Sequence, residues 1–259
     1  MAALSDAWFS VFPAPRIPDV LAYVDGTWNW LRRTFAESVA FQHDEPTLTD
    51  NLCEALADRG RRLAHRMDCD FQSETWELRR AADGTTARQA RADIRVILGA
   101  PGTPHLVIEF KKLDGTTNAR WRYFFDGVNR FIEGKYAVGH AVGVMCGFSS
   151  PPFAGEAHSL ADYIRLPRHA VQLVCITNSS GDVVTMPSAV APANVSFDTH
   201  HSRPSQTLAE PIALLHMLLT CTKSVSPNPP VGLMLSRRPT DKLTKRKAGI
   251  RGPAHEPKL

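Results

Sequence analysis

The stretch RADIRVILGAPGTPHLVIEFKKL, residues 91–113, decides the fold. Two apolar runs flank a turn rich in glycine and proline, a pattern typical of two neighbouring strands. Side chains alternate between the faces of a strand, so Glu109 and Lys111 share one face while Ile108 and Phe110 share the other. If the two strands pair as a hairpin, Asp93 lies beside Glu109. Two acids and a lysine are therefore expected to converge.

This convergence has a chemical meaning. Carboxylate oxygens are the ligands that Mg²⁺ prefers, and a lysine beside them can orient a water or offset the charge of a phosphate. The other two acid-x-lysine pairs, Glu133 with Lys135 and Glu256 with Lys258, fall in a helix-like stretch and in a proline-rich tail. A charged pair inside an apolar run is costly unless a metal or another charge compensates it. A metal site and a structural ion pair at the end of a sheet both satisfy this requirement.

Composition limits the class of protein. A chain of 259 residues with 43% hydrophobic content can bury a substantial core. It has no apolar run of the roughly 20 residues that span a bilayer, and no signal-peptide pattern at its start. The five cysteines are odd in number and scattered, which favours reduced thiols. We therefore expect a cytoplasmic protein that does not contact a membrane.

Charge and composition predict three parts: an N-terminal helical segment over residues 1–40, a main domain over 41–235, and a basic tail over 236–259. From Arg237 onward the chain holds eight lysines and arginines against two acids, with several prolines and little apolar content. Such a tail is expected to be disordered. It either holds polyanion phosphates through counterion release or serves as a solubilising end.

Apolar periodicity predicts an α/β (α+β) fold in which helices flank a mixed central sheet. The expected order, ending in a C-terminal helical extension, is helices at 19–40 and 47–63, strands at 73–80, 90–98 and 105–113, a helix within 120–140, a strand at 141–148, a helix at 159–166, a strand at 170–177 and an apolar helix at 207–221. A strand that returns to its sheet through a helix usually pairs in parallel.

Residues 41–148 resemble the PD-(D/E)xK superfamily, the restriction-endonuclease-like nucleases, which share an αβββαβ core. The resemblance implies a Mg²⁺-dependent (or Mn²⁺-dependent) phosphodiesterase site built from Glu45, Asp93, Glu109 and Lys111. It further implies that the carboxylates of Asp93 and Glu109 ligate the metal with the Phe110 carbonyl, and that Glu45 holds a metal-bound water or a second ion. The residue before Asp93 is alanine, where the name-giving motif has proline.

Two of these roles have alternatives. Glu45 stands at the start of a predicted helix, where an acid also complements the positive end of the helix. Lys111 is expected to orient the attacking water or to stabilise the pentavalent phosphate. A nearby cation should lower its pKa, which would open a role as a base.

Two later stretches, YFFDGVNRFIEGKYA (123–137) and FDTHHSRPSQTLAEPIALLHMLL (197–219), resemble bacterial members of the superfamily, some associated with phage defence. The resemblance implies nucleic-acid contacts for Arg130, His201 and Arg203. The alternatives are a surface pair between Arg130 and Asp126, and an exposed polar loop for His201 and Arg203.

The expected function is a metal-dependent endonuclease that acts on DNA in preference to RNA, in bacterial defence or in a mobile element. A catalytically idle module that binds nucleic acid or a partner protein is the main alternative. A nuclease subunit regulated by a protein partner is a third. Relatives that cut both strands as dimers leave a homodimer open, and the chain has no phosphate-binding loop motif for ATP.

Overall fold

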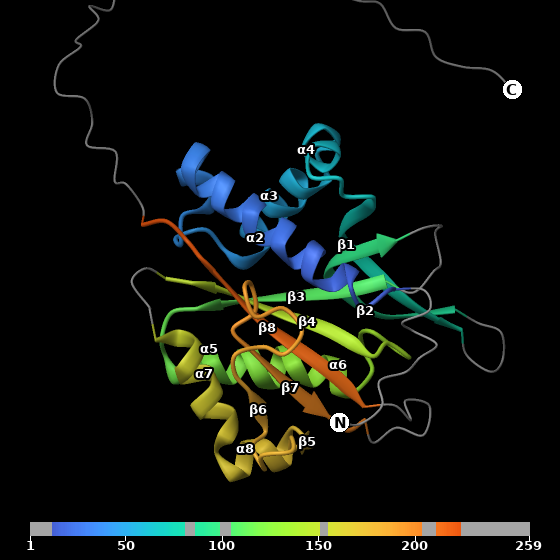
Figure 1. Ribbon diagram of the computed structural model, residues 1–259, viewed down its shortest axis with the longest axis vertical. Coiled ribbons are helices and arrows are strands. Elements are labelled where there is room, and N and C mark those ends of the chain that lie inside the picture. Colours follow the sequence, from blue (N-terminus) through green and yellow to red (C-terminus); the bar gives the residue numbers. More distant parts are fainter. Residues whose placement is uncertain (1–11, 81–85, 99–104, 151–154, 204–210, 224–259) are drawn as a thin grey trace, which may run out of the picture. The chain divides into compact units, whose positions relative to one another are not determined.

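A computed structural model describes residues 12–80, 86–98, 105–150, 155–203 and 211–223. Within them one mixed sheet runs in the order β1-β2-β3-β4-β8-β7-β5, and β6 pairs with β7 (Figure 1). The pairs β3–β4 and β4–β8 are parallel, whereas the other pairs are antiparallel. The strands are β1 (Cys69–Arg80), β2 (Thr86–Leu98), β3 (His105–Leu113), β4 (Val142–Ser149), β5 (Cys175–Ile176), β6 (Val184–Thr185), β7 (Phe197–His201) and β8 (Ile212–Thr220).

Helices cover both faces of this sheet, as Figure 1 shows. One face carries α2 (Arg16–Thr34), η1 (Ala36–Val39), α3 (Glu45–Ala57) and α4 (Arg59–Ala64). The other carries α5 (Thr117–Trp121), η2 (Arg122–Val128), α6 (Asn129–Ile132), α7 (Glu156–Arg165) and α8 (Pro167–Gln172). The predicted α+β class with a mixed sheet flanked by helices is confirmed.

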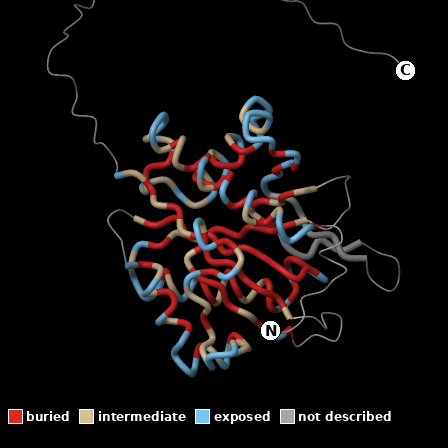
Figure 2. The backbone as a smooth tube through the Cα atoms, viewed as in Figure 1, coloured by how far each residue is buried: buried red, intermediate tan, exposed pale blue. Residues whose placement is uncertain are grey.

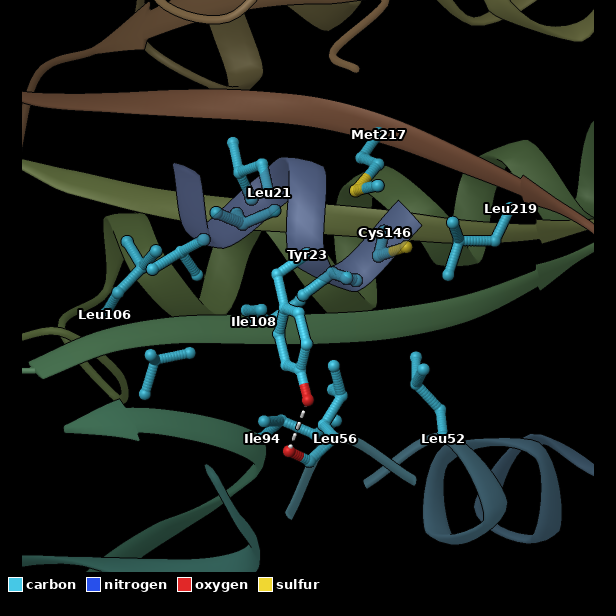
Figure 3. Close-up of a cluster of buried hydrophobic side chains, with 14 of the residues drawn as sticks. Leu21, Tyr23, Leu52, Leu56, Ile94, Leu106, Ile108, Cys146, Met217 and Leu219 are labelled. Carbon is cyan, nitrogen blue, oxygen red and sulfur yellow. Dashed lines mark hydrogen bonds between the residues drawn. The ribbon is translucent and has the colours of Figure 1, made fainter. Parts of the chain in front are cut away.

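The first layer packs α2 and α3 onto the even-numbered side chains of β2, β3 and β4 and the odd-numbered side chains of β8 (Figure 3). Leu21 and Leu52 meet Ile94 and Ile108 there, all fully buried. The hydroxyl of Tyr23 donates a hydrogen bond of 3.1 Å to the Leu56 carbonyl and joins the two helices. Because α2 shares this core with the strands, the predicted segment 1–40 is part of the main body from α2 onward, and not a separate helical domain.

The second layer contains α7, α8 and one continuous helical run from α5 to α6 whose middle, η2, is π-helical. π-helical turns are rare, and many accompany functional sites. Gly127 lies in η2 where an added Cβ would come within 2.5 Å of the Met145 side chain and 3.7 Å of Lys111 Cγ. The glycine therefore allows the helix to lie directly over β3 and β4.

The prediction of an apolar helix at 207–221 is wrong. Residues Ile212–Thr220 form β8, a strand paired on both sides, between β4 and β7. Most of its side chains are buried, as the colouring in Figure 2 shows for the middle of the sheet. A central strand is apolar on both faces, so it lacks the alternation that would distinguish it from a buried helix.

A second prediction fails in part. The stretch 170–177 was expected to be a strand, but α8 extends to Gln172 and only Cys175–Ile176 pair as β5. The remaining predicted elements are present with shifted ends, and the helix expected at 47–63 is divided at Asp58 into α3 and α4. The glycine- and proline-rich turn between the strands at 90–98 and 105–113 and the basic tail at 236–259 lie outside the described residues.

Two further observations bear on the sequence-based expectations. None of the helices in the described part of the chain has the length and apolar character that crossing a bilayer requires. The five cysteines are free thiols, as expected from their number and spacing.

Candidate active site

Asp93 and Glu109 lie side by side on the face of the sheet covered by α5, η2 and α6. The β2–β3 ladder pairs Ile94 with Ile108, so Asp93 and Glu109 are the next two positions in register. There the backbone pairing stops, and Asp93 Oδ2 instead accepts a hydrogen bond of 2.7 Å from the Phe110 N–H. The carboxylate thus replaces a backbone carbonyl at the point where the ladder ends.

Lys111 connects Glu45 with the residues of β3 through hydrogen bonds of its ammonium group. Its ammonium donates to Glu45 Oε1 at 2.9 Å, to Glu109 Oε1 at 2.9 Å and to the Phe110 carbonyl at 2.6 Å. The second oxygen of Glu45 accepts from the Lys112 N–H at 3.1 Å. The four residues predicted from the sequence therefore form one cluster, which we call the carboxylate–lysine cluster.

Glu45 reaches this cluster because of where α3 begins. Asp44 caps the helix by accepting the Thr47 N–H at 2.9 Å, and Pro46 occupies the first turn. Glu45 is the first residue of α3, so its carboxylate lies at the positive end of the helix and also faces β3. The carboxylate of Glu45 therefore both complements the positive end of α3 and contacts Lys111.

Arg130 contacts the cluster from α6. Its Nη1 donates to Glu109 Oε1 at 3.0 Å and to the Tyr136 hydroxyl at 2.6 Å. The alternative of a surface pair with Asp126 is thus replaced by contacts with a buried carboxylate. The sequence favoured a core role for Tyr136, which lies in the stretch 123–137, because its contact with Arg130 depends on a turn that brings it back to α6.

Burial dominates the electrostatics of the two acids. Burial raises the pKa of Asp93, although the charge of Lys111 and the Phe110 N–H oppose the shift. Burial and the neighbouring charge of Asp93 raise the pKa of Glu109 to about 8, against the lowering effect of Lys111 and Arg130. Two carboxylates that share a dry site favour retention of a proton or the binding of a cation.

The predicted fall in the pKa of Lys111 depends on a nearby metal cation, whereas the protein groups alone shift this pKa upward. Burial alone would lower its pKa, but the charges of Glu109, Glu45 and Asp93 outweigh burial and raise it. In this arrangement the side chain is a fixed ammonium cation at neutral pH. This finding favours an electrostatic role for Lys111 over a role as a base.

A divalent cation fits part of this arrangement. Among the described residues no group of three or more histidine, cysteine, aspartate or glutamate side chains forms a ready cage for a metal. Glu109 Oε2, however, is buried and makes no hydrogen bond with the described residues. This oxygen and the Asp93 carboxylate offer hard ligands for Mg²⁺, whereas the Phe110 carbonyl, also predicted as a ligand, accepts from Lys111.

A hollow of about 470 Å³ opens beside Glu45 and is also lined by Phe41, Lys112 and Arg122. Lys112 is held at its edge, where its ammonium donates to the carbonyls of Phe41 and His43 at 2.6 and 2.7 Å. A larger hollow of about 700 Å³ between α2 and α3 contains none of the predicted site residues. We take the smaller hollow as the entrance to the cluster because Glu45 belongs to both.

His201 and Arg203 are not on an exposed loop. His201 is fully buried at the end of β7, where Nδ1 lies 2.8 Å from the Leu173 carbonyl and Nε2 lies 2.7 Å from the Thr199 hydroxyl. With both ring nitrogens engaged in the interior, His201 does not reach a substrate at the surface. Arg203 is also buried, at 7% exposure, but unlike His201 its side-chain nitrogens make no hydrogen bond with the described residues.

No protein-family model, no curated protein and no solved structure matches this chain. The function is therefore inferred from the geometry and chemistry of the site itself.

Proposed function

We propose that this protein is a metal-dependent nuclease that hydrolyses phosphodiester bonds in DNA. The observation that carries the proposal is the convergence of Glu45, Asp93, Glu109 and Lys111, drawn from one helix and two strands, on a single buried position. The element order from α3 through β1, β2, β3 and α5–α6 to β4 supports the proposal, because the resemblance to the PD-(D/E)xK superfamily implies an αβββαβ core.

The chemistry of the cluster suits this reaction. Phosphodiester cleavage builds negative charge on the phosphoryl and leaving oxygens, so fixed positive charge in a dry site lowers the barrier. A bound Mg²⁺ or Mn²⁺, held by Asp93 and Glu109, would supply Lewis-acid stabilisation and a more acidic water. Lys111 would direct its ammonium at the phosphoryl group, and Glu45 would hold that ammonium in place.

Cleavage assays test the proposal directly. Purified protein is incubated with plasmid, linear duplex and single-stranded DNA in Mg²⁺ or Mn²⁺, with EDTA as the blank. We expect cleavage by the wild type only with metal, and no cleavage by Asp93→Asn. RNA of matched sequence, run in parallel, tests the preference for DNA.

Asp198 provides a matched control for Asp93. It is a buried strand aspartate whose Oδ2 likewise accepts a backbone N–H, that of Ala189, at 2.7 Å. Asp198→Asn should cost a similar amount of stability and leave cleavage intact in the fraction that folds. Cutting by Asp93→Asn at the wild-type rate would sink the assignment.

The main alternative, a binding module without catalysis, has one observation in its favour. Both carboxylate oxygens of Glu45 and one of Glu109 already accept hydrogen bonds from a lysine side chain or from the backbone, as in a purely structural ion cluster. DNA binding in EDTA with no cleavage in any metal would favour this module. A regulated subunit would be silent alone and would cut once its partner was added.

A further inference from the structure

Arg203 carries a buried guanidinium that lacks a counterpart within the described part of the chain. It lies two residues beyond the end of β7, and its side-chain nitrogens Nε, Nη1 and Nη2 are all buried without a hydrogen bond to any described residue. Burial alone lowers the pKa of Arg203 to about 10, with no acid among the causes. An unpaired cation in the interior is among the costliest arrangements in a protein.

Other arginines in the structure show how the chain compensates such a charge when the partner is its own. Arg120 donates to both oxygens of the buried Glu156, at 2.9 and 3.1 Å. At the surface, Arg165 likewise binds Asp182 through two nitrogens. Arg203 has no such carboxylate among the described residues, so its charge is open to an external anion.

The neighbours of Arg203 point to the same kind of ligand. The rings of His105 and His140, which stand at the starts of β3 and β4, meet edge to face with centroids 4.7 Å apart. Burial, followed by the charges of His105, Arg203 and Arg95, lowers the pKa of His140 to about 3. Two arginines and two histidines therefore lie close together. We call these four residues, Arg95, His105, His140 and Arg203, the basic cluster.

The basic cluster lies on the same sheet face as the carboxylate–lysine cluster. Arg95 follows Asp93 by two residues on β2, which places it on the same face and about 7 Å along the strand. His105 precedes Glu109 by four residues on β3, about 13 Å away and again on the same face. One strand of duplex DNA carries a phosphate for every 3.4 Å or so of helix axis. Neighbouring phosphates of a single strand can therefore occupy both clusters.

We infer that the basic cluster binds a backbone phosphate of the nucleic-acid strand, a few nucleotides from the phosphate that is cleaved. The inference rests on the proposed function for the identity of the ligand. Arg203 supplies a planar fork of donors that matches the tetrahedral oxygens of a phosphate, and Arg95 adds a second charge. The site fixes the register of the strand relative to Asp93 and Glu109.

A metal-free melting experiment tests the site without catalysis. The melting temperature of the full chain is measured in EDTA while inorganic phosphate replaces chloride at constant ionic strength. We expect phosphate to raise the melting temperature of the wild type. Arg203→Met should melt at or above the wild type in chloride, because it removes an unpaired buried charge, and should lose the response to phosphate.

Arg120→Gln is the matched control. It leaves the buried Glu156 without its cation, so it should lower the melting temperature in both buffers while the phosphate response remains. A phosphate response retained in Arg203→Met would overturn the inference. So would an Arg203→Met protein that is destabilised in chloride as strongly as Arg120→Gln, because Arg203 would then have a partner within the chain. If Arg203→Met does not fold, Arg95→Gln takes its place, and an undiminished response in that variant has the same meaning.

Cleavage kinetics then separate the two proposals. For Arg203→Met we expect KM for a DNA oligonucleotide to rise about tenfold, while the rate on bis(4-nitrophenyl) phosphate, a single small phosphodiester, stays at the wild-type value. If the wild-type protein responds to phosphate but cleaves neither substrate, the nuclease proposal is wrong and the basic cluster is still an anion site. A wild type that cleaves both but shows no phosphate response would sink the basic cluster alone.

Discussion

Arg130 and Lys111 donate hydrogen bonds to the same oxygen of Glu109, Oε1, at 3.0 and 2.9 Å. Two cations from different elements thus hold one side of a buried carboxylate, and the other oxygen, Oε2, has no hydrogen bond with the described residues. This asymmetry orients Glu109: the protein fixes one oxygen and leaves the other available to the metal ion of the proposed function.

Lys111→Ala should lower the rate of Mg²⁺-dependent DNA cleavage by about 10²- to 10³-fold, because it removes a fixed cation from the reacting phosphate. Since the pKa of Lys111 is raised, the wild-type rate should show no loss from lysine deprotonation between pH 7 and pH 9. Lys135→Ala is the matched control, because Lys135 forms the same acid-x-lysine pair, with Glu133, at the surface. Equal rates for the two variants would contradict the role of Lys111.

Arg130→Gln should increase the Mg²⁺ concentration needed for half-maximal cleavage by about tenfold, the equivalent of one pKa unit. The charge of Arg130 lowers the pKa of Glu109, so its removal leaves less ionised carboxylate at neutral pH. Arg130→Lys retains a cation and should lie between the wild type and Arg130→Gln. A Mg²⁺ titration of cleavage measures the shift, and an unchanged midpoint in Arg130→Gln would count against this role.

The protein should lose stability as the pH falls below about 6.5. Burial lowers the pKa of His201 to about 4 and that of His216 well below its ordinary value. The unfolded chain therefore takes up protons on these rings near pH 6.5 while the folded chain does not, and each ring costs about 1.4 kcal/mol per pH unit below that value. For His201 this loss ends near pH 4, where the folded state is protonated as well.

Urea unfolding at a series of pH values measures this slope. His216→Gln should flatten the dependence of the unfolding free energy on pH, whatever its effect at pH 7. His158→Gln, at an exposed position of α7, should leave the slope as it is in the wild type. An identical slope in His216→Gln would show that its ring does not titrate between the two states as described.

Gly143→Ala should destabilise the fold by about 1–3 kcal/mol. An added Cβ would come within 2.6 Å of the Phe131 ring and 3.0 Å of Leu214, and a packed ring between a helix and two strands has little room to move. Gly26→Ala is the control, because no atom lies within 4 Å of the added Cβ and the site is inside α2. That variant should gain about 0.5–1 kcal/mol from helix propensity. Thermal or urea unfolding compares the two.

Local sequence pattern was sufficient to predict that three residues of the carboxylate–lysine cluster lie together. Asp93, Glu109 and Lys111 follow from strand alternation and from the pairing of two adjacent strands, both of which operate over a few residues. Glu45 came from the family resemblance, since no local rule connects the start of α3 with β3. The two contacts of Glu45 with β3 span more than sixty residues of chain.

The errors arise where distant segments decide the environment. The run at 212–220 became a strand because β4 and β7 pair with its two edges, which its own apolar composition does not reveal. His201 and Arg203 read as loop residues because their polarity suggested exposure, yet β7 extends to His201 and both side chains are buried. Tyr136 was read as core, and its hydroxyl proved to support Arg130.

The position of β8 in the middle of the sheet has a consequence for biosynthesis. This strand is the last described element of the chain, yet β4 and β7, made earlier, each pair with it. A nascent polypeptide therefore cannot complete the sheet until residue 220 has emerged from the ribosome. Truncated translation products lack the strand that joins the two halves, so the complete architecture belongs only to chains synthesised through that point.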